Sequence, residues 1–116
     1  MRNFNKYRAI KTLYKDEWYD SKLEANCAME LDLLQRAGQI VEYKRQVKID
    51  LIAWEKKICM YKIDFVVLHN DGHSEYLEAK GMVTRDWKLK WKLLEAQLAH
   101  TDANATMSLY VKARQN

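Results

Sequence analysis

The sequence contains no proline, only three glycines and two cysteines, and no long apolar run. Because repeats, low-complexity tracts and linkers are also absent, residues 1–116 are expected to form one domain with one core. No stretch approaches the roughly 18 apolar residues of a membrane span, and residues 1–15 lack the apolar centre of a secretory signal, so no membrane partner is expected. Cys27 and Cys59 lie in unrelated apolar contexts, which predicts buried thiols in a reducing compartment and therefore a cytoplasmic protein.

The amino-acid composition is typical of a globular protein, and the chain is basic. The composition is 48% hydrophobic and 31% charged, with four tryptophans and seven tyrosines. The net charge is +4, and the basic residues gather in two zones around a more acidic middle. The first zone precedes Asp16 and comprises Arg2, Lys6, Arg8, Lys11 and Lys15. The second zone comprises Arg85, Lys88, Lys90 and Lys92. Two such zones fit a polyanionic partner with a metal site between them. Lysines that are simply solvated on the surface would give the same pattern, so charge alone does not establish that the partner is nucleic acid.

Hydrophobic periodicity predicts two helices. The first covers residues 21–37, where Ser21 and Glu24 form a capping box and Gly38 is a natural stop. Its inner face is expected to hold the apolar residues spaced three or four apart, namely Leu23, Cys27, Leu31 and Leu34. The second helix covers residues 84–99 and begins at Thr84 as its cap. Its inner face is expected to hold Leu89, Leu93 or Leu94, and Leu98.

Alternating patterns predict four strands, at residues 40–52, 58–69, 74–80 and 106–112. The second of these is expected to bury one apolar side, composed of Tyr61, Ile63, Phe65 and Val67. The core therefore spans residues 21–112 in the order α-β-β-β-α-β. Residues 1–20 form a basic N-terminal segment or a short hairpin turning at Asp16-Glu17. This order indicates an α/β (α+β) fold, in which a central mixed sheet is flanked by helices and the last strand can pair in parallel.

Two carboxylates occur where the strand patterns are strongest. Asp64 interrupts "YKIDFVVL", and Glu78 lies in "EYLEAKG". The register between their strands decides whether they share a face. A two-residue turn at 71–72 would place Asp64 opposite Ala79, with the carboxylates on opposite sides. A three-residue loop at 70–72 would place Asp64 opposite Glu78, and the glycine at its third position suits the left-handed conformation that this loop requires.

Two facing carboxylates repel each other unless a cation lies between them. Mg²⁺ binds carboxylate oxygens and retains several waters. The candidate ligands are therefore Asp64, Glu78 and the backbone carbonyl of Ala79. Lys80 lies two residues beyond Glu78 on the same face, where it could orient or deprotonate an attacking water or offset the charge of a phosphate. These residue types indicate a metal-assisted reaction at a phosphate.

The spacing of Asp64 and Glu78-Ala79-Lys80 within this element order resembles the PD-(D/E)xK nuclease superfamily, over residues 20–112. Ile63 replaces the proline of that name, at a position that varies widely in the superfamily. More narrowly, "YDSKLEA", "YKIDFVV" and "EYLEAKG", followed by a Lys-rich helix, resemble a family of small phage and prophage proteins thought to be nucleases akin to phage Holliday-junction resolvases. The resemblance implies a restriction-endonuclease-like core that hydrolyses DNA with Mg²⁺ or Mn²⁺.

The resemblance also implies a role for Glu24 as a metal ligand or as a partner of a metal-bound water. The capping box is the alternative role, because a side chain folded back onto the Ser21 amide cannot reach a metal.

Further residues are candidate contacts to DNA. The basic residues expected to grip the phosphate backbone are Lys6, Arg8, Lys11, Arg85, Lys88 and Lys90. The strand residues that border the site, on faces that could equally be solvated, are Gln46, Lys48 and Lys62. The tryptophans available for base stacking are Trp54, Trp87 and Trp91. Packing against the sheet or a partner is an equal alternative for the last two. His69 and His73 flank a hairpin tip, and their spacing there does not favour a zinc site.

The main expectation is a metal-dependent endonuclease that hydrolyses DNA phosphodiester bonds. The resemblance implies branched DNA as the substrate, in phage recombination, replication or packaging within the host cytoplasm. Symmetric cleavage of a branch requires two sites, so a homodimer is expected. The alternative is a non-catalytic nucleic-acid-binding module on the same fold, which would bind DNA without metal-dependent turnover. A basic protein that binds a host protein is a third hypothesis, and it needs no converging carboxylates.

Overall fold

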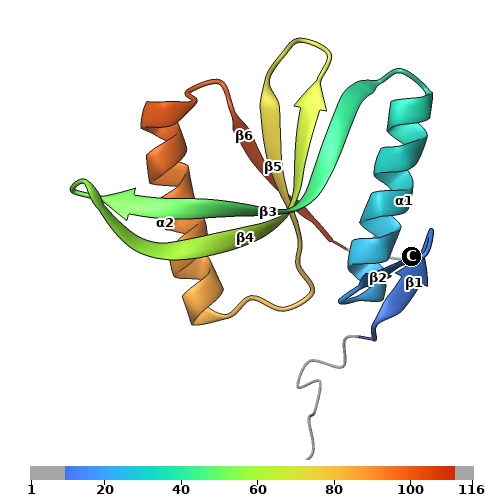
Figure 1. Cartoon of the computed structure of the whole chain (residues 1–116), viewed down its shortest axis with the longest axis horizontal. Coiled ribbons are helices and arrows are strands. Elements are labelled where there is room, and N and C mark those ends of the chain that lie inside the picture. Colours follow the sequence, from blue (N-terminus) through green and yellow to red (C-terminus); the bar gives the residue numbers. More distant parts are fainter. Residues whose placement is uncertain (1–9, 112–116) are drawn as a thin grey trace, which may run out of the picture.

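The computed structural model describes residues 10–111. The elements in chain order are β1 (Thr12–Tyr14), β2 (Glu17–Tyr19), α1 (Lys22–Arg36), β3 (Ile40–Ala53), β4 (Lys56–His69), β5 (Ser74–Ala79), α2 (Arg85–Thr101) and β6 (Thr106–Tyr110). Strands β3, β4 and β5 pair antiparallel in succession, and β6 pairs in parallel with β5 after the α2 crossover (Figure 1). The predicted mixed sheet and its element order are confirmed. Neither described helix is long and apolar enough to cross a membrane.

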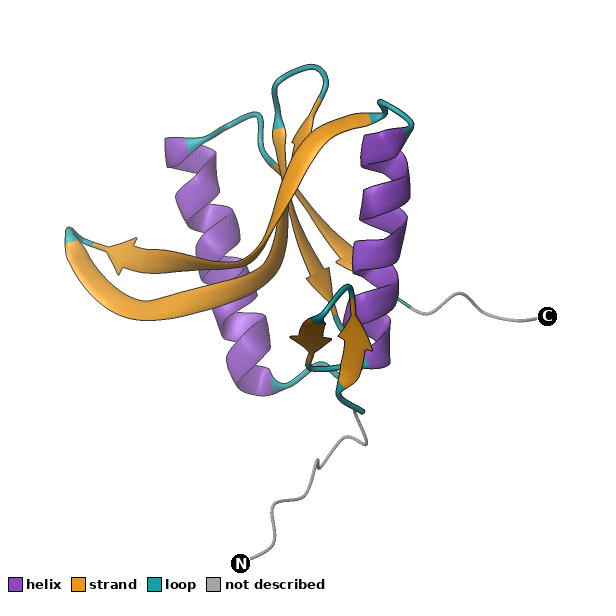
Figure 2. Ribbon diagram, turned by 45° about the vertical axis from the view of Figure 1, so that its right-hand side comes forward, coloured by secondary structure: helices purple, strands orange, loops and turns teal. Residues whose placement is uncertain are grey.

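The two helices cover opposite faces of the sheet (Figure 2). Phe65, Val67 and Leu77 pack in a buried cluster with the inner face of α1. Val66 and Tyr76, which alternate with them along the strands, pack in a second cluster with α2. The apolar interior therefore consists of two clusters separated by the sheet, rather than the one core expected from chain length.

The inner faces of both helices differ from the predicted ones at one leucine each. Leu34 is 36% exposed because the buried stripe of α1 ends at Leu31. Leu89 is 60% exposed, whereas Leu94 and Leu98 are buried. Helix α2 turns an inward stripe toward the sheet, made of Trp87, Trp91, Leu94 and Leu98. The two tryptophans of α2 therefore pack against the sheet, which was the alternative to base stacking.

Strands β3 and β4 bend sharply at Gln46 and Asp64. Arg45 pairs with Phe65 and Val47 with Ile63, so the register is the same on both sides of the bend, but the intervening residues do not pair. Gln46 has a φ of 54°, in the left-handed region that residues other than glycine seldom adopt.

The bend divides the apolar side that the sequence predicted for β4. Phe65 and Val67 belong to the α1 cluster, whereas Tyr61 and Ile63 belong to the α2 cluster. All four side chains are buried as predicted, but they do not lie on one face. Beyond the bend, residues 47–63 continue as a two-stranded arm, which projects from the body at the left of Figure 1.

The N-terminal hairpin β1–β2 packs beside α1. Its turn is Lys15-Asp16, one residue earlier than predicted, and both residues have positive φ, as the tight turns that match strand twist require. The hydroxyls of Tyr14 and Tyr43 donate to the Asp32 carboxylate, which ties the hairpin and β3 to α1.

The two cysteines are both free thiols. Cys27 is buried in the α1 cluster, as predicted, whereas Cys59 on the arm is only partly buried.

Candidate functional site

The β4–β5 hairpin has the loop that brings the two carboxylates together. His69 donates its backbone N–H to His73 at 3.0 Å, and Gly72 donates to His69 at 2.9 Å, which closes the three-residue loop. Gly72 has a φ of 92°, the left-handed conformation that the prediction assigned to it. The paired ladder ends at Phe65 and Leu77, and the same register carried one residue further would set Asp64 opposite Glu78.

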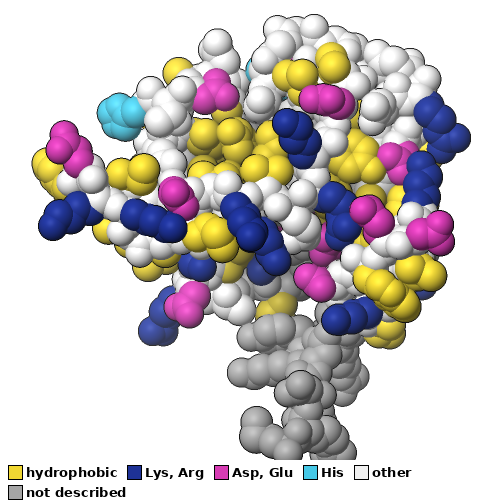
Figure 3. Space-filling model, in the orientation of Figure 1, with side chains coloured by type: hydrophobic (Ala, Val, Ile, Leu, Met, Phe, Trp, Pro, Cys, Tyr) yellow, Lys and Arg dark blue, Asp and Glu magenta, His cyan; other side chains and the backbone are white. Residues whose placement is uncertain are grey.

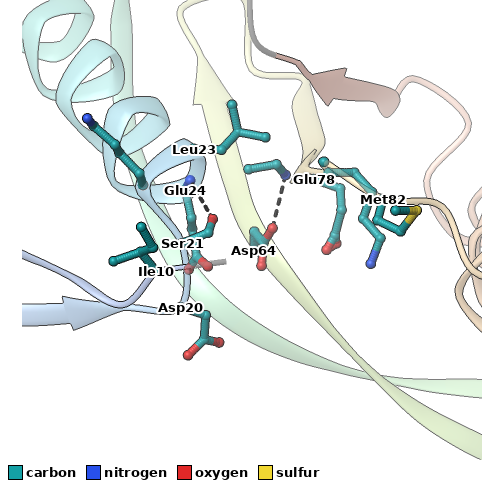
Figure 4. Close-up of a pocket in the computed structure, with 12 residues that line it drawn as sticks. Ile10, Asp20, Ser21, Leu23, Glu24, Asp64, Glu78 and Met82 are labelled. Carbon is teal, nitrogen blue, oxygen red and sulfur yellow. Dashed lines mark hydrogen bonds between the residues drawn. The ribbon is translucent and has the colours of Figure 1, made fainter. Parts of the chain in front are cut away.

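Asp64 is fixed at the edge of β5 by a backbone contact. Its Oδ2 accepts the N–H of Ala79 at 2.9 Å. This hydrogen bond orients the carboxylate at the point where β5 ends and the segment that leads to α2 begins. Figure 4 shows Asp64 between Glu24 and Glu78, which come from α1 and β5.

These residues line a pocket of about 550 Å³. The polar residues of its wall include Asp20, Ser21, Lys22, Glu24, Asp64, Glu78 and Lys80. Among the described residues, the charged side chains that are buried are Glu24 and Glu78, and both belong to this wall. Burying a carboxylate costs free energy unless it has partners, so carboxylates converging on a pocket are typical of functional sites.

Burial raises the pKa of Asp64 most, and the negative charges of Glu78 and Glu24 raise it further, to about 8. The Ala79 amide and the positive charge of Lys80 oppose this rise without cancelling it. The pKa of Glu78 is raised by burial, and that of Glu24 by burial and by the charge of Asp20. The pocket therefore concentrates negative charge that a cation would neutralise.

Glu78 is held by a chain of hydrogen bonds from the α2 side of the sheet. Tyr61 donates its hydroxyl to Glu78 Oε2 at 3.0 Å, and Trp87 Nε1 donates to the Tyr61 oxygen at 2.9 Å. The strand pattern predicted Tyr61 only as a member of the apolar side of β4. Its polar role depends on the bend in β4, and no local sequence signal marks it.

Lys80 follows β5 and lines the same pocket. Its backbone N–H donates to Tyr110 at 3.2 Å, which extends the pairing of β5 with β6 by one residue. Its Nζ lies 5.2 Å from the centre of the Trp87 ring. Its positive charge lowers the pKa of both Asp64 and Glu78. The structure thus brings together Asp64, Glu78 and Lys80.

Glu24 faces the pocket rather than the start of its own helix. Ser21 caps α1 by accepting the backbone N–H of Glu24 at 3.0 Å, which is half of the predicted capping box. The Glu24 carboxylate instead accepts hydrogen bonds from Gln46 at 2.7 Å and from Arg45 at 3.4 Å. Arg45 also stacks 3.7 Å from the centre of the Tyr19 ring, a second supporting contact that the sequence analysis missed.

These contacts separate the roles of Ser21 and Glu24 in a way that can be measured. Ser21→Ala is expected to lower the free energy of unfolding by about 1 kcal/mol through the lost cap, with little effect on the affinity of the folded protein for Mg²⁺. Glu24→Gln keeps the helix cap and most of the side-chain volume, and it is expected to weaken any binding of Mg²⁺ in the pocket about tenfold or more. Equal effects of the two variants on Mg²⁺ affinity, after correction for folded fraction, would contradict this separation.

The donor set suits a hard divalent cation. Within residues 10–111, no three or more His, Cys, Asp or Glu side chains converge as a ready-made metal cage. Mg²⁺, however, is commonly held by one or two carboxylates together with waters and substrate phosphates. Asp64 and Glu78 supply that pair of carboxylates, and the excess negative charge of the pocket fits a cation of this kind.

The residues predicted to contact DNA lie on several different elements of the structure. Lys6 and Arg8 lie outside the described residues, and Lys11 is exposed next to the N-terminal hairpin. Gln46 borders the site directly through Glu24. On the exposed side of α2 the structure places Arg85 and Lys88, whereas Lys90 reaches back to the Met60 carbonyl at 3.4 Å.

The two histidines of the β4–β5 hairpin contact acidic neighbours. Their rings stack with centres 4.3 Å apart, and each ring lies next to one carboxylate, from Glu75 for His69 and from Asp71 for His73. These contacts within the hairpin give both histidines a structural role in the loop.

The chain belongs to a family described as "Protein of unknown function (DUF1064)", whose match covers residues 4–113. No curated protein and no solved structure matches the chain.

Proposed function

We propose that this protein is a metal-dependent endonuclease that hydrolyses DNA phosphodiester bonds. The observation that carries the proposal is the pocket on which Asp64 and Glu78 converge, with Lys80 and Glu24 on its wall. We further propose that the mixed sheet and its two helices are a restriction-endonuclease-like core. The resemblance of the sequence to PD-(D/E)xK nucleases supports both statements.

Asp64 and Glu78 would hold Mg²⁺ or Mn²⁺, with the Ala79 carbonyl beside them and Glu24 acting directly or through a water. When bound there, such an ion supplies Lewis-acid activation of water and neutralises phosphate charge. The contacts made by Ala79 and Tyr61 keep the two carboxylates pointed into the pocket before substrate arrives.

Lys80 would act on the reacting groups through its ammonium. Its place beside both carboxylates lets it orient the attacking water and offset the charge that develops on the phosphate. The neighbouring Trp87 ring supports the cation without giving it a competing carboxylate partner.

Branched DNA cut by a homodimer is the substrate and assembly that we propose. Two identical sites related by a twofold axis can cut two strands of a branch symmetrically. The small domain offers little surface for reading a base sequence, which favours recognition of DNA shape.

Cleavage of a four-way DNA junction tests the proposal. The wild type and the control Lys44→Ala, at an exposed lysine of β3, are expected to cut the junction in Mg²⁺ and not in EDTA, whereas Lys80→Ala is expected to cut about a hundredfold more slowly. A matched linear duplex reports preference for the branch. Tight binding of the junction without cleavage in Mg²⁺ or Mn²⁺ would instead identify a non-catalytic binding module and overturn the endonuclease.

A further inference from the structure

The arm ends in a tryptophan that packs against nothing. Trp54 is 97% exposed at the tip of the β3–β4 hairpin. Trp54 and Glu55 form its two-residue turn and have φ of 53° and 66°. A turn of this kind favours Asn-Gly or Asp-Gly, since both positions need positive φ. A bulky aromatic residue here costs backbone strain and gains no burial within the described chain, so the stability of the domain does not explain its presence.

The arm is held firmly up to its tip. The Gln97 side chain on α2 donates to the Asp50 carbonyl at 2.9 Å and accepts the Ile52 N–H at 2.8 Å. The inner side of the arm buries Leu51 and Tyr61 against α2. The backbone of the arm is therefore anchored to within two residues of Trp54, which reduces the entropy that binding must offset.

The outer side of the arm is basic where it leaves the pocket. Lys48 lies directly opposite Lys62 across the two strands, and neither is in an ion pair within residues 10–111. Like charges directly opposed on a sheet destabilise it. Lys62 is two residues from Asp64, so this pair lies on the path from the pocket to the arm.

Residues 47–63 carry four lysines and two acids, and one of those acids, Asp50, is paired with Lys57 at 3.2 Å. Lys and Arg side chains follow the projecting arm in Figure 3. Exposed apolar side chains accompany them, namely Ile52, Trp54, Ile58 and Met60. A basic track that ends in an exposed indole matches a nucleic-acid strand, in which phosphates alternate with stacking bases.

We propose that the arm binds DNA, with Lys48 and Lys62 on the phosphates and the Trp54 ring stacked on a base where the duplex is interrupted. Eight strand residues, 56–63, lie between the turn and Asp64, which places the turn about 26 Å along the arm from the pocket. At 3.4 Å per base pair this span covers about eight base pairs. The proposal deepens the proposed function, on which its link to cleavage rests, by assigning a surface that recognises the branch.

The test measures DNA binding in EDTA, so that cleavage plays no part. The probes are a linear duplex and the same duplex interrupted by an unpaired 2-aminopurine nucleotide, whose fluorescence reports stacking. Three full-length variants are compared with the wild type. Trp54→Asn removes the ring and suits the turn, Trp54→Phe keeps an aromatic ring, and Glu55→Gly relaxes the turn while keeping the indole.

The expected result is that Trp54→Asn weakens binding of the interrupted probe about tenfold or more and abolishes the 2-aminopurine response. Binding of the linear duplex should change less than about threefold for the same variant. Trp54→Phe and Glu55→Gly should keep most of both signals. Trp54→Asn should melt at the same temperature as the wild type or higher, which separates lost stacking from lost folding.

A second set of variants tests the lysine pair. Lys62→Gln is expected to lower affinity for both probes and to reduce the salt dependence of binding by about one phosphate contact. Lys44→Gln, at an exposed lysine of β3 outside the arm, is the control and should change neither the affinity nor its salt dependence.

Unchanged binding of the interrupted probe by Trp54→Asn would overturn the proposal. A change from dimer to monomer in Trp54→Asn, with DNA affinity intact, would overturn it as well and would identify the arm as a self-association surface. These outcomes are separate from the endonuclease itself, because a binding failure leaves Mg²⁺-dependent cleavage of linear DNA measurable, and a cleavage failure leaves binding measurable.

Discussion

Asp64→Asn is expected to abolish cleavage and, at about pH 8, to make the folded protein more stable than the wild type. The loss of cleavage follows because the amide removes one of the two carboxylates proposed to hold the metal. Mutation of a group that only orients a metal ligand typically lowers metal affinity or activity about 10–100-fold. Loss of the ligand itself should therefore lower the cleavage rate about a hundredfold or more.

The gain in stability follows from the surroundings of the side chain. Asp64 lies between Glu78 and Glu24, and burial and their charges raise its pKa to about 8. Asparagine keeps an oxygen to accept the Ala79 N–H and removes the charge. Each unit of pKa shift corresponds to about 1.4 kcal/mol, and after allowance for coupling between the carboxylates we expect a gain on the order of 2 kcal/mol, or about 5–10 °C in Tm.

Thermal melts in EDTA at about pH 5 and about pH 8 measure this gain. At about pH 5 folded Asp64 is protonated but the unfolded chain has already released that proton, so the difference between wild type and Asp64→Asn should be clearly smaller than at about pH 8 and should vanish only below the ordinary pKa of 3.8. Asp50→Asn is the matched control, because Asp50 is exposed on the arm in an ion pair with Lys57. A destabilised Asp64→Asn at about pH 8 would show that the carboxylate is not under electrostatic strain.

Magnesium is expected to reverse the pH dependence of stability. The folded pKa of Asp64 is above its ordinary value of 3.8, and those of Glu78 and Glu24 are raised as well. Between the ordinary and the raised pKa, the folded protein holds protons that the unfolded chain has released. The free energy of unfolding should therefore fall as the pH rises from about 4 to about 8 in EDTA, and then level off.

A divalent cation competes with those protons for the same oxygens. Excess Mg²⁺ should therefore raise Tm strongly at about pH 8, where the carboxylates are charged, and little at about pH 5. The measurement is a series of melts across this pH range in EDTA and in excess Mg²⁺. Asp64→Asn should lose most of the Mg²⁺ effect, whereas Asp50→Asn should keep it. An equal Mg²⁺ effect in Asp64→Asn would place the cation elsewhere.

The local features of the site follow from short stretches of sequence. Gly72 predicted a tight turn that needs positive φ and left a two-residue and a three-residue loop open, and the structure has the three-residue loop. Ser21 predicted the start of α1 because its hydroxyl satisfies a free N–H there. These signals act within a few residues, so the pattern of residue types is sufficient to read them.

Other features of the site depend on contacts between distant segments. The side chain of Glu24 turns to Gln46 and Arg45, which are more than twenty residues away, instead of completing its capping box. Tyr61 reaches Glu78 because β4 bends beside Asp64. Neither contact has a sequence signal, because each depends on how α1 and the bent strands pack.

The sequence by itself determined the order of the elements and identified Asp64 and Glu78 as the candidate carboxylates, and it left the length of the hairpin loop between them open. Periodicity, capping and turn chemistry are local, and they fix these features one segment at a time. Only the tertiary structure decided that Gln46 bends the sheet, that Trp87 and Trp91 pack inward, and that Trp54 projects at the tip of a basic arm. A strand carries the same alternating pattern whether it stays flat or bends, so the faces that it presents are set by the helices packed against it.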